Sequence, residues 1–184
     1  MRIEKLIATY NVNAQWIHFP LHPDTPAQGL ALEDLFRAGP DVIQQKNHDM
    51  KQRMAAEGLP YGDRTHTYNS RLAQELGKWA DTQPGGVAMH DALFKAYFVD
   101  ARNVHDLDVL LDVTASVGLP VDEARAVLEE RRFEKAVDDD WAKSRLYGVT
   151  GVPTFVAGRK GVVGAQPYEV IEHLLVEAGA QASG

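Results

Sequence analysis

The sequence predicts an α/β fold in which a long helical segment separates the predicted strands. Apolar residues recur at helical spacing, with short breaks, from about residue 30 to residue 147. On either side, residues 14–19 and 153–164 are rich in β-branched and aromatic residues and are bounded by proline or glycine, which is typical of strands. The expected order is helix, strand, helical block, strand, strand, helix.

Composition limits the function classes. A chain of 184 residues is long enough for one buried core, and 45% hydrophobic with 24% charged residues is ordinary for a globular protein. A formal net charge of −7 argues against nucleic acid or a membrane surface as the main partner. No apolar run approaches the roughly 20 residues of a membrane helix. The N-terminus has no signal-peptide core, so a cytoplasmic location is expected.

The chain has no cysteine, which excludes disulfides, thiolate nucleophiles and cysteine-ligated zinc. Its seven histidines form no His-x3-His or His-Glu-x-x-His pair, so no metal site is predicted. Ser70 does not lie in the Gly-x-Ser-x-Gly pattern of serine hydrolases. Catalytic residues are therefore not assigned from the sequence.

The first predicted elements are a short amphipathic helix over 2–9 and a strand over 14–19, which Pro20 ends. The helical block then follows, broken at Gly58, at Pro84–Gly86 and at Gly118–Pro120. Its predicted helices are 30–38, 41–57, 69–80, 87–98, 106–116, 121–129 and 133–146.

The C-terminal region predicts a hairpin and a last helix. Residues 153–157 and 161–164 have strand composition, and the turn between them contains Gly158 and Gly161. Pro167 suits the first turn of a helix that runs to about Glu177. The small and polar tail over 178–184 is expected to fray.

A candidate binding segment precedes the hairpin and consists of Thr150, Gly151, Val152 and Pro153. Proline belongs at a strand's first residue or edge because it cannot donate to the ladder. An X-Pro bond there is a candidate for the cis isomer, and the trans isomer remains the alternative. Exposed backbone groups before the proline can pair with an extended peptide or with a glutathione-like ligand.

Four stretches carry a resemblance to a known family: Thr150–Phe155 with the hairpin after it, His22–Pro26, Thr67–Leu72 and Ala96–Val99. In this order they resemble the DsbA-like thioredoxin-fold oxidoreductases. The FrnE-like branch is most similar, with 2-hydroxychromene-2-carboxylate isomerases and kappa-class glutathione transferases as relatives. The resemblance implies a thioredoxin-like core over 1–37 and 141–184 and an inserted helical domain over 38–140.

The resemblance also shows a departure. The family carries Cys-x-x-Cys where its first strand meets its first helix, whereas Arg2–Leu6 resembles the middle of that helix. The first strand and the redox motif are therefore absent here. Three solutions remain open: the hairpin pairs directly with 14–19, another chain fills the gap, or the chain starts further upstream.

Two further polar residues are candidates for substrate binding. Asn69 lies where glutathione-dependent relatives place a polar side chain near the ligand, although asparagine also suits the start of the next helix. Gln166 lies where kappa-class transferases carry a serine-aspartate pair for the ligand's charged end.

Three functions remain open. The first is a thiol–disulfide oxidoreductase by descent, inactive or truncated in this chain. The second is a glutathione-dependent isomerase or transferase, with glutathione as the one cofactor considered. The third is a non-catalytic module that binds extended peptides. Expected partners are thus a thiol or extended-peptide substrate or a glutathione-like molecule, with no nucleic acid or membrane. Whether the chain forms a homodimer is left open.

Overall fold

The structure is a computed structural model that describes residues 2–183. Contacts divide the chain into two compact units. We call Met1–Leu21 with Asp139–Gly184 the terminal unit and His22–Asp138 the helical unit. Residues 22–37, which the sequence analysis placed with the core, lie in the helical unit.

The helical unit is built from helices that agree closely with the expected ranges. They are α2 (Leu32–Phe36), α3 (Pro40–Ala56), α4 (Arg71–Ala80), α5 (Ala88–Phe98), α6 (Leu107–Ser116) and α7 (Val121–Glu129), and α8 (Glu134–Leu146) contains the boundary with the terminal unit. Pro40 opens α3 at its first turn, where the missing N–H removes no helical hydrogen bond. The Asp106 side chain caps α6 by accepting from the Asp108 N–H at 2.9 Å.

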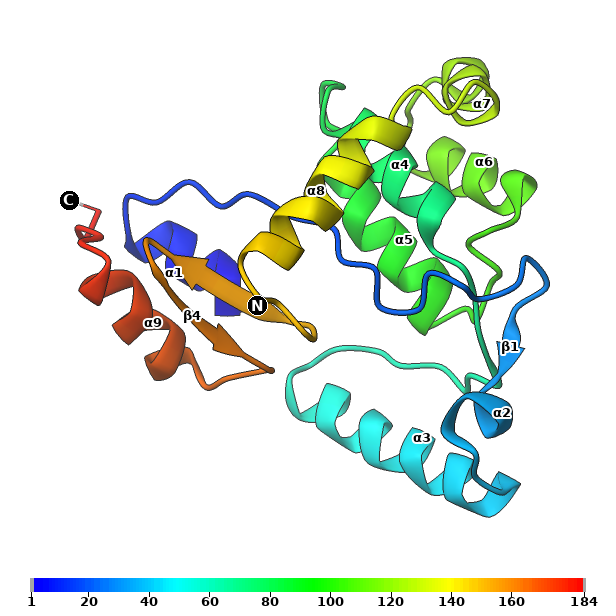
Figure 1. Cartoon of the computed structure of the whole chain (residues 1–184), viewed down its shortest axis with the longest axis horizontal. Helices are drawn as coiled ribbons and strands as arrows, with labels where there is room; N and C mark the ends of the chain where they lie inside the picture. The colour runs from blue at the N-terminus through cyan, green and yellow to red at the C-terminus, as the bar shows by residue number, and fades with distance from the viewer. Residues whose placement is uncertain (1, 184) are drawn as a thin grey trace. The chain divides into compact units, whose positions relative to one another are not determined.

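The core of the helical unit lies among α4, α5, α6 and α7, which pack against one another (Figure 1). Trp79 on α4 is 1% exposed, and its indole N–H donates to the Glu123 carboxylate at 3.0 Å. This satisfies the polar edge of the largest buried side chain. Its core neighbours include Leu76, Met89, Leu110, Ala124, Val127 and Leu128.

A two-residue ladder joins distant parts of the helical unit. β1 (Leu30–Ala31) pairs antiparallel with β2 (His66–Thr67). The helix expected over 30–38 is therefore wrong at both ends: its first two residues are a strand, and Arg37 stops α2 with a left-handed φ of 50°. Such short strands depend on a partner far along the chain, which local patterns do not reveal.

The terminal unit contains α1 (Arg2–Thr9), the hairpin of β3 (Thr154–Ala157) and β4 (Lys160–Val163), and α9 (Tyr168–Glu177). The expected helix, hairpin and last helix are thus confirmed. α9 packs along both strands of the hairpin (Figure 1). The Tyr10 hydroxyl donates to the Glu172 carboxylate at 3.0 Å, and Lys5 lies 4.2 Å from the centre of the Tyr168 ring.

The end of the C-terminal tail, which was expected to fray, pairs with the residues at and after the end of α1. The Asn11 N–H donates to the Gln181 carbonyl at 2.9 Å, and the Ser183 N–H donates to the Thr9 carbonyl at 2.8 Å. Tyr10 and Ala182 form an antiparallel bridge. Backbone hydrogen bonds attach this segment to the chain, since its small and polar side chains have little apolar surface to bury.

The strand expected over residues 14–19 is also wrong, because no strand pairs with this segment within residues 2–183. It is held instead by α8: the His18 N–H donates to the Asp140 carboxylate at 2.9 Å, and Lys143 donates to the Gln15 side chain at 3.3 Å. Direct pairing between this segment and the hairpin, one of the three solutions above, does not occur. No helix within the described residues is long and apolar enough to cross a membrane.

Candidate functional site

The candidate binding segment connects α8 to β3. Gly148, two residues after the end of α8, has a φ of 66° that suits glycine, and the Val149 N–H then donates to the Ser144 carbonyl at 3.0 Å. The Thr154 hydroxyl donates to the Gly151 carbonyl at 2.7 Å. The Val152–Pro153 peptide bond is cis. Local hydrogen bonds thus hold the segment at both of its ends.

Val152 and Thr150 are the two residues of this segment whose backbone N–H and carbonyl form no hydrogen bond within the described residues, and Val152 presents the larger apolar side chain. Half of its surface is exposed. Neither its N–H nor its carbonyl forms a hydrogen bond with any part of the chain that the structure describes. Thr150 is exposed as well, whereas Gly151 is half-buried. A backbone donor and acceptor are therefore left without a partner in the chain beside an exposed apolar side chain, which is a suitable surface for an extended chain.

Pro153 and Gln166 are linked through the end of the hairpin. The Gly164 N–H donates to the Pro153 carbonyl at 2.7 Å, so the hairpin ladder extends one pair beyond the strands. The Gln166 side-chain amide donates to the Val163 carbonyl at 2.6 Å. Gln166 thus caps the last carbonyl of β4. The sequence analysis had predicted this side chain to bind a ligand, and its amide forms this bond within the chain instead.

Asn69 belongs to the helical unit, whereas the other five predicted residues belong to the terminal unit. Its carbonyl oxygen accepts from the Arg71 N–H at 2.9 Å, as a capping residue does at the start of a helix. Its amide donates to the carbonyls of Pro23 and Thr25, both at 3.0 Å. These three bonds make Asn69 a structural residue that fixes the loop at 23–25 to the start of α4.

We therefore expect Asn69→Ala to lower the free energy of unfolding by about 1–2 kcal/mol, because a cap and two bonds to the loop are lost. Asn69→Asp should cost less, since aspartate keeps the capping oxygen and loses the amide donor. Urea unfolding of both variants checks this, and calorimetric titration with glutathione accompanies it. Wild-type stability of Asn69→Ala together with lost glutathione binding would instead assign Asn69 to a ligand site.

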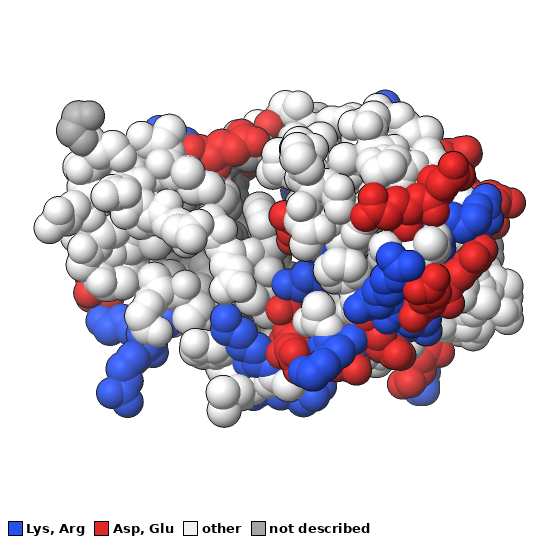
Figure 2. Space-filling view, turned by 90° about the horizontal axis from the view of Figure 1, so that it is seen from above, with Lys and Arg blue, Asp and Glu red and all other residues white. Residues whose placement is uncertain are grey.

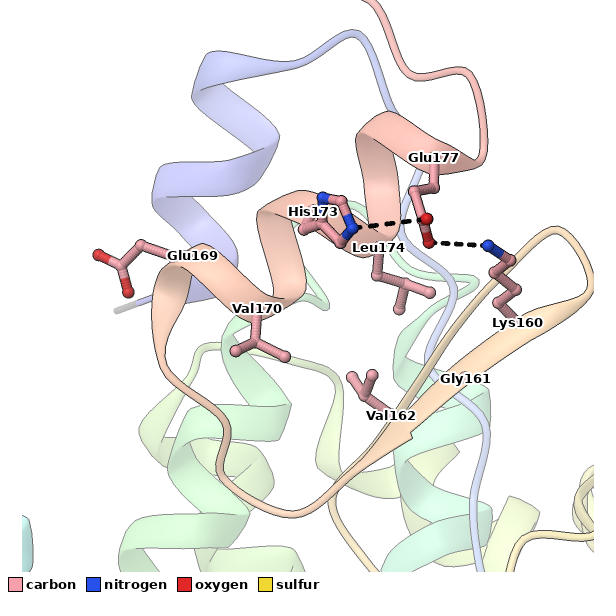
Figure 3. Close-up of a pocket in the computed structure, with 8 residues that line it drawn as sticks. All are labelled: Lys160, Gly161, Val162, Glu169, Val170, His173, Leu174 and Glu177. Carbon is pink, nitrogen blue, oxygen red and sulfur yellow. Dashed lines mark hydrogen bonds and ion pairs between the residues drawn. The ribbon is translucent and has the colours of Figure 1, made fainter.

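Sequence reasoning missed a groove of about 760 Å³ between β4 and α9 (Figure 3). Lys160 donates to the Glu177 carboxylate at 2.9 Å, and the other oxygen of Glu177 lies 3.4 Å from His173. The hydrogen bond from Lys160 lowers the pKa of Glu177. Val162, Val170 and Leu174 form the apolar lining of the groove. The i,i+4 spacing of His173 and Glu177 can be seen in the sequence. The contact of Lys160 with Glu177 cannot, because it forms only when the chain folds.

A buried carboxylate was also missed. Glu75 has no exposed surface, and it accepts hydrogen bonds from Arg71 at 2.7 Å and from Arg131 at 2.6 and 2.8 Å. Burial alone raises the pKa of Glu75, but the bonds from Arg131 and Arg71 outweigh it, so the pKa is lowered. Both carboxylate oxygens are used, so Glu75 holds the helical unit together. No cluster of three or more His, Cys, Asp or Glu side chains within residues 2–183 is arranged to hold a metal ion.

This geometry defines a class of protein in which a small α/β unit is joined to a helical unit. The α/β unit contains a hairpin that begins directly after a proline. The family described as DSBA-like thioredoxin domain matches residues 1–176, and the chain belongs to that family. The thioredoxin-like fold predicted from the sequence is therefore confirmed, and the cysteine-free chain is a departure from the family's redox motif.

Two relatives extend this comparison. A Streptomyces coelicolor protein described as a probable DsbA oxidoreductase is 30% identical, with a TM-score of 0.86 over 96% of this chain and 81% of that one. The uncharacterized protein YwbO of Bacillus subtilis (strain 168) is 26% identical over 172 residues, covering 92% of this chain and 84% of YwbO. Both likenesses extend over nearly the whole chain, so the helical unit is a shared part of the fold.

Proposed function

We propose that this chain derives from a thiol–disulfide oxidoreductase of the FrnE-like branch and binds extended polypeptides through Thr150–Pro153 without exchanging disulfides itself. The family and the oxidoreductase neighbour support the descent. The absence of cysteine from the sequence removes the dithiol step. The observation that carries the binding function is the available backbone of Val152, presented by a segment whose ends are fixed.

The contacts around Val152 explain how this segment can bind a polypeptide although the chain has no redox cysteines. The Thr154–Gly151 and Gly164–Pro153 hydrogen bonds hold the segment without help from a sulfur atom. A preformed donor and acceptor bind an extended chain at low entropic cost, since little of the protein has to be ordered. The ligand is expected to be an unfolded segment, because a folded one has already paired its backbone groups.

Reduced and carboxymethylated α-lactalbumin tests this proposal because it is permanently unfolded and has no free thiol. We expect it to bind in calorimetry, while insulin reduction in the presence of dithiothreitol stays at the uncatalysed rate. Val152→Asp should weaken binding about tenfold, because it places a charge beside the backbone groups and removes an apolar contact.

The matched control is Val87→Asp, which makes the same substitution at a valine of the helical unit that is 75% exposed. It should bind like the wild type. Equal affinities for the two aspartate variants would contradict a site at Val152. Binding of glutathione without binding of α-lactalbumin would favour the isomerase or transferase class instead.

A further inference from the structure

The groove between β4 and α9 has the size and the apolar lining of a small-molecule site. Its volume of about 760 Å³ lies within the range of such sites, which is roughly 300–1,000 Å³. The side chains of Val162, Val170 and Leu174 line it (Figure 3). Val170 is 38% exposed, so part of this apolar surface is open to a ligand. The groove lies within the terminal unit, and Thr150–Pro153 does not contribute to its lining.

At one end of the groove, the charged side chains already have partners. The Lys160 ammonium donates to one oxygen of Glu177 at 2.9 Å, and His173 lies 3.4 Å from the other oxygen. The positive charge of Lys160 balances the negative charge of Glu177. This end therefore does not select a charged ligand.

The other end of the groove carries a carboxylate without a partner. Glu169 lies in the first turn of α9, is exposed, and forms no hydrogen bond or ion pair within residues 2–183. It precedes Glu177 by eight residues, so the two ends of the groove are about 12 Å apart along the helix. Figure 3 shows the three apolar side chains between these ends.

The charge of the lining favours a ligand with one positive charge. Because Lys160 balances Glu177, Glu169 leaves the lining residues with a formal net charge of −1 when histidine is neutral. Figure 2 shows acidic and basic side chains intermixed on the face in view, so charge alone does not mark a site on this protein. The groove differs because an unpaired carboxylate lies beside an apolar lining.

The edge of β4 favours a small ligand over an added strand. The Gln166 amide caps the last carbonyl of β4 at 2.6 Å, and Lys160 is the first residue of the strand. Capped groups and lysines at a sheet edge oppose pairing with another strand. The occupant is therefore not a polypeptide that extends the sheet.

We propose that the groove between β4 and α9 binds a small amine with an apolar body. The ammonium group pairs with Glu169, and the apolar body covers Val162, Val170 and Leu174. Burial of apolar surface supplies most of the affinity, since an ion pair with an exposed carboxylate contributes little. The carboxylate decides which sign of charge the groove accepts. Binding here does not require the polypeptide site at Val152, because that residue lies outside the lining.

The probe is hexylammonium, titrated into the isotope-labelled full chain and followed by amide NMR. The amide signals of Val162, Val170 and Leu174 should shift. Hexylammonium should bind about threefold more tightly than hexanol, which lacks the charge, and at least about tenfold more tightly than methylammonium, which lacks the apolar body. Hexanoate should bind more weakly than hexanol. Equal affinities for hexylammonium and hexanoate, or shifts confined to residues outside the groove, overturn the proposal.

Glu169→Gln removes the charge and keeps the size of the side chain. Its affinity for hexylammonium should fall about threefold, to the value for hexanol, while its affinity for hexanol stays unchanged. Asp122→Asn is the matched control, because Asp122 is likewise exposed in the first turn of a helix, α7, and forms no hydrogen bond or ion pair with the described part of the chain. It should bind both compounds like the wild type.

Equal losses in the two variants contradict a site at Glu169. A lower free energy of unfolding in Glu169→Gln with unchanged affinity for hexylammonium means that Glu169 only stabilises the start of α9, and it also overturns the proposal. Binding of carboxymethylated α-lactalbumin should be the same in Glu169→Gln and the wild type. A failure of amine binding therefore leaves the proposed function at Val152 standing.

Discussion

Replacing Glu75 with glutamine is expected to lower the free energy of unfolding by about 3 kcal/mol at neutral pH. The carboxylate is fully buried and is the common acceptor for Arg71 and Arg131. Glutamine keeps the size of the side chain but removes its charge, so two guanidinium groups lose the anion between them. Arg71 retains Asp138 at 2.8 Å, which limits the loss. Urea unfolding at pH 7 measures the difference.

The same pair of proteins should show a defined pH dependence. The pKa of Glu75 is lowered in the folded state, so its contribution is present above the unfolded pKa of about 4.3 and is lost as the pH falls through the folded value. The stability gap between wild type and Glu75→Gln should therefore be constant at neutral pH and shrink under acidic conditions. A gap that persists in acid would mean that packing, and not charge, explains it.

Glu130→Gln is the matched control. Glu130 also accepts a hydrogen bond from an arginine, Arg132 at 2.7 Å, and its pKa is likewise lowered by that bond. Both partners of this pair are about half exposed. Solvent screens such surface pairs, so the substitution should leave stability unchanged. An equal loss in the two variants would show that burial does not decide the effect.

The helices could be predicted because their signal is local. The range 121–129 matches α7 residue for residue, since proline precedes it and its apolar positions repeat at helical spacing. The segment 14–19 has strand composition but no partner strand within the described residues, and β1 is too short to carry a pattern. Strand formation depends on what lies alongside, which composition does not reveal.

The candidate site shows the same difference between local patterns, which the sequence reveals, and contacts between distant residues, which it does not. Thr150–Pro153 could be identified from a local motif, and the backbone of Val152 forms no hydrogen bond with the part of the chain that the structure describes. Asn69 and Gln166 were assigned by position in a family, and their hydrogen bonds lie within the chain. Glu75 has one partner that a local pattern shows, Arg71 four residues earlier, but its second partner, Arg131, is 56 positions away. A residue's role was visible only where its partners are its neighbours in sequence.

Gly86→Ala is expected to destabilise the protein by about 3 kcal/mol, the upper part of the range for forced overpacking. Gly86 lies in the turn between α4 and α5, and a Cβ there would lie 1.7 Å from the carbonyl oxygen of Ala80. Ala80 is fully buried at the end of α4, so the backbone cannot yield as an exposed side chain would. Thermal and urea unfolding measure the loss.

The turn's geometry explains why a single methyl group matters. The Gly86 carbonyl accepts from the N–H of Met89, a fully buried core residue, so moving Gly86 away from Ala80 also displaces the start of α5. Gly39→Ala is the control, because a Cβ there meets no atom within 4 Å. It should leave stability close to that of the wild type. Similar stabilities for the two variants would show that α4 and α5 can separate at little cost, contrary to close packing at this turn.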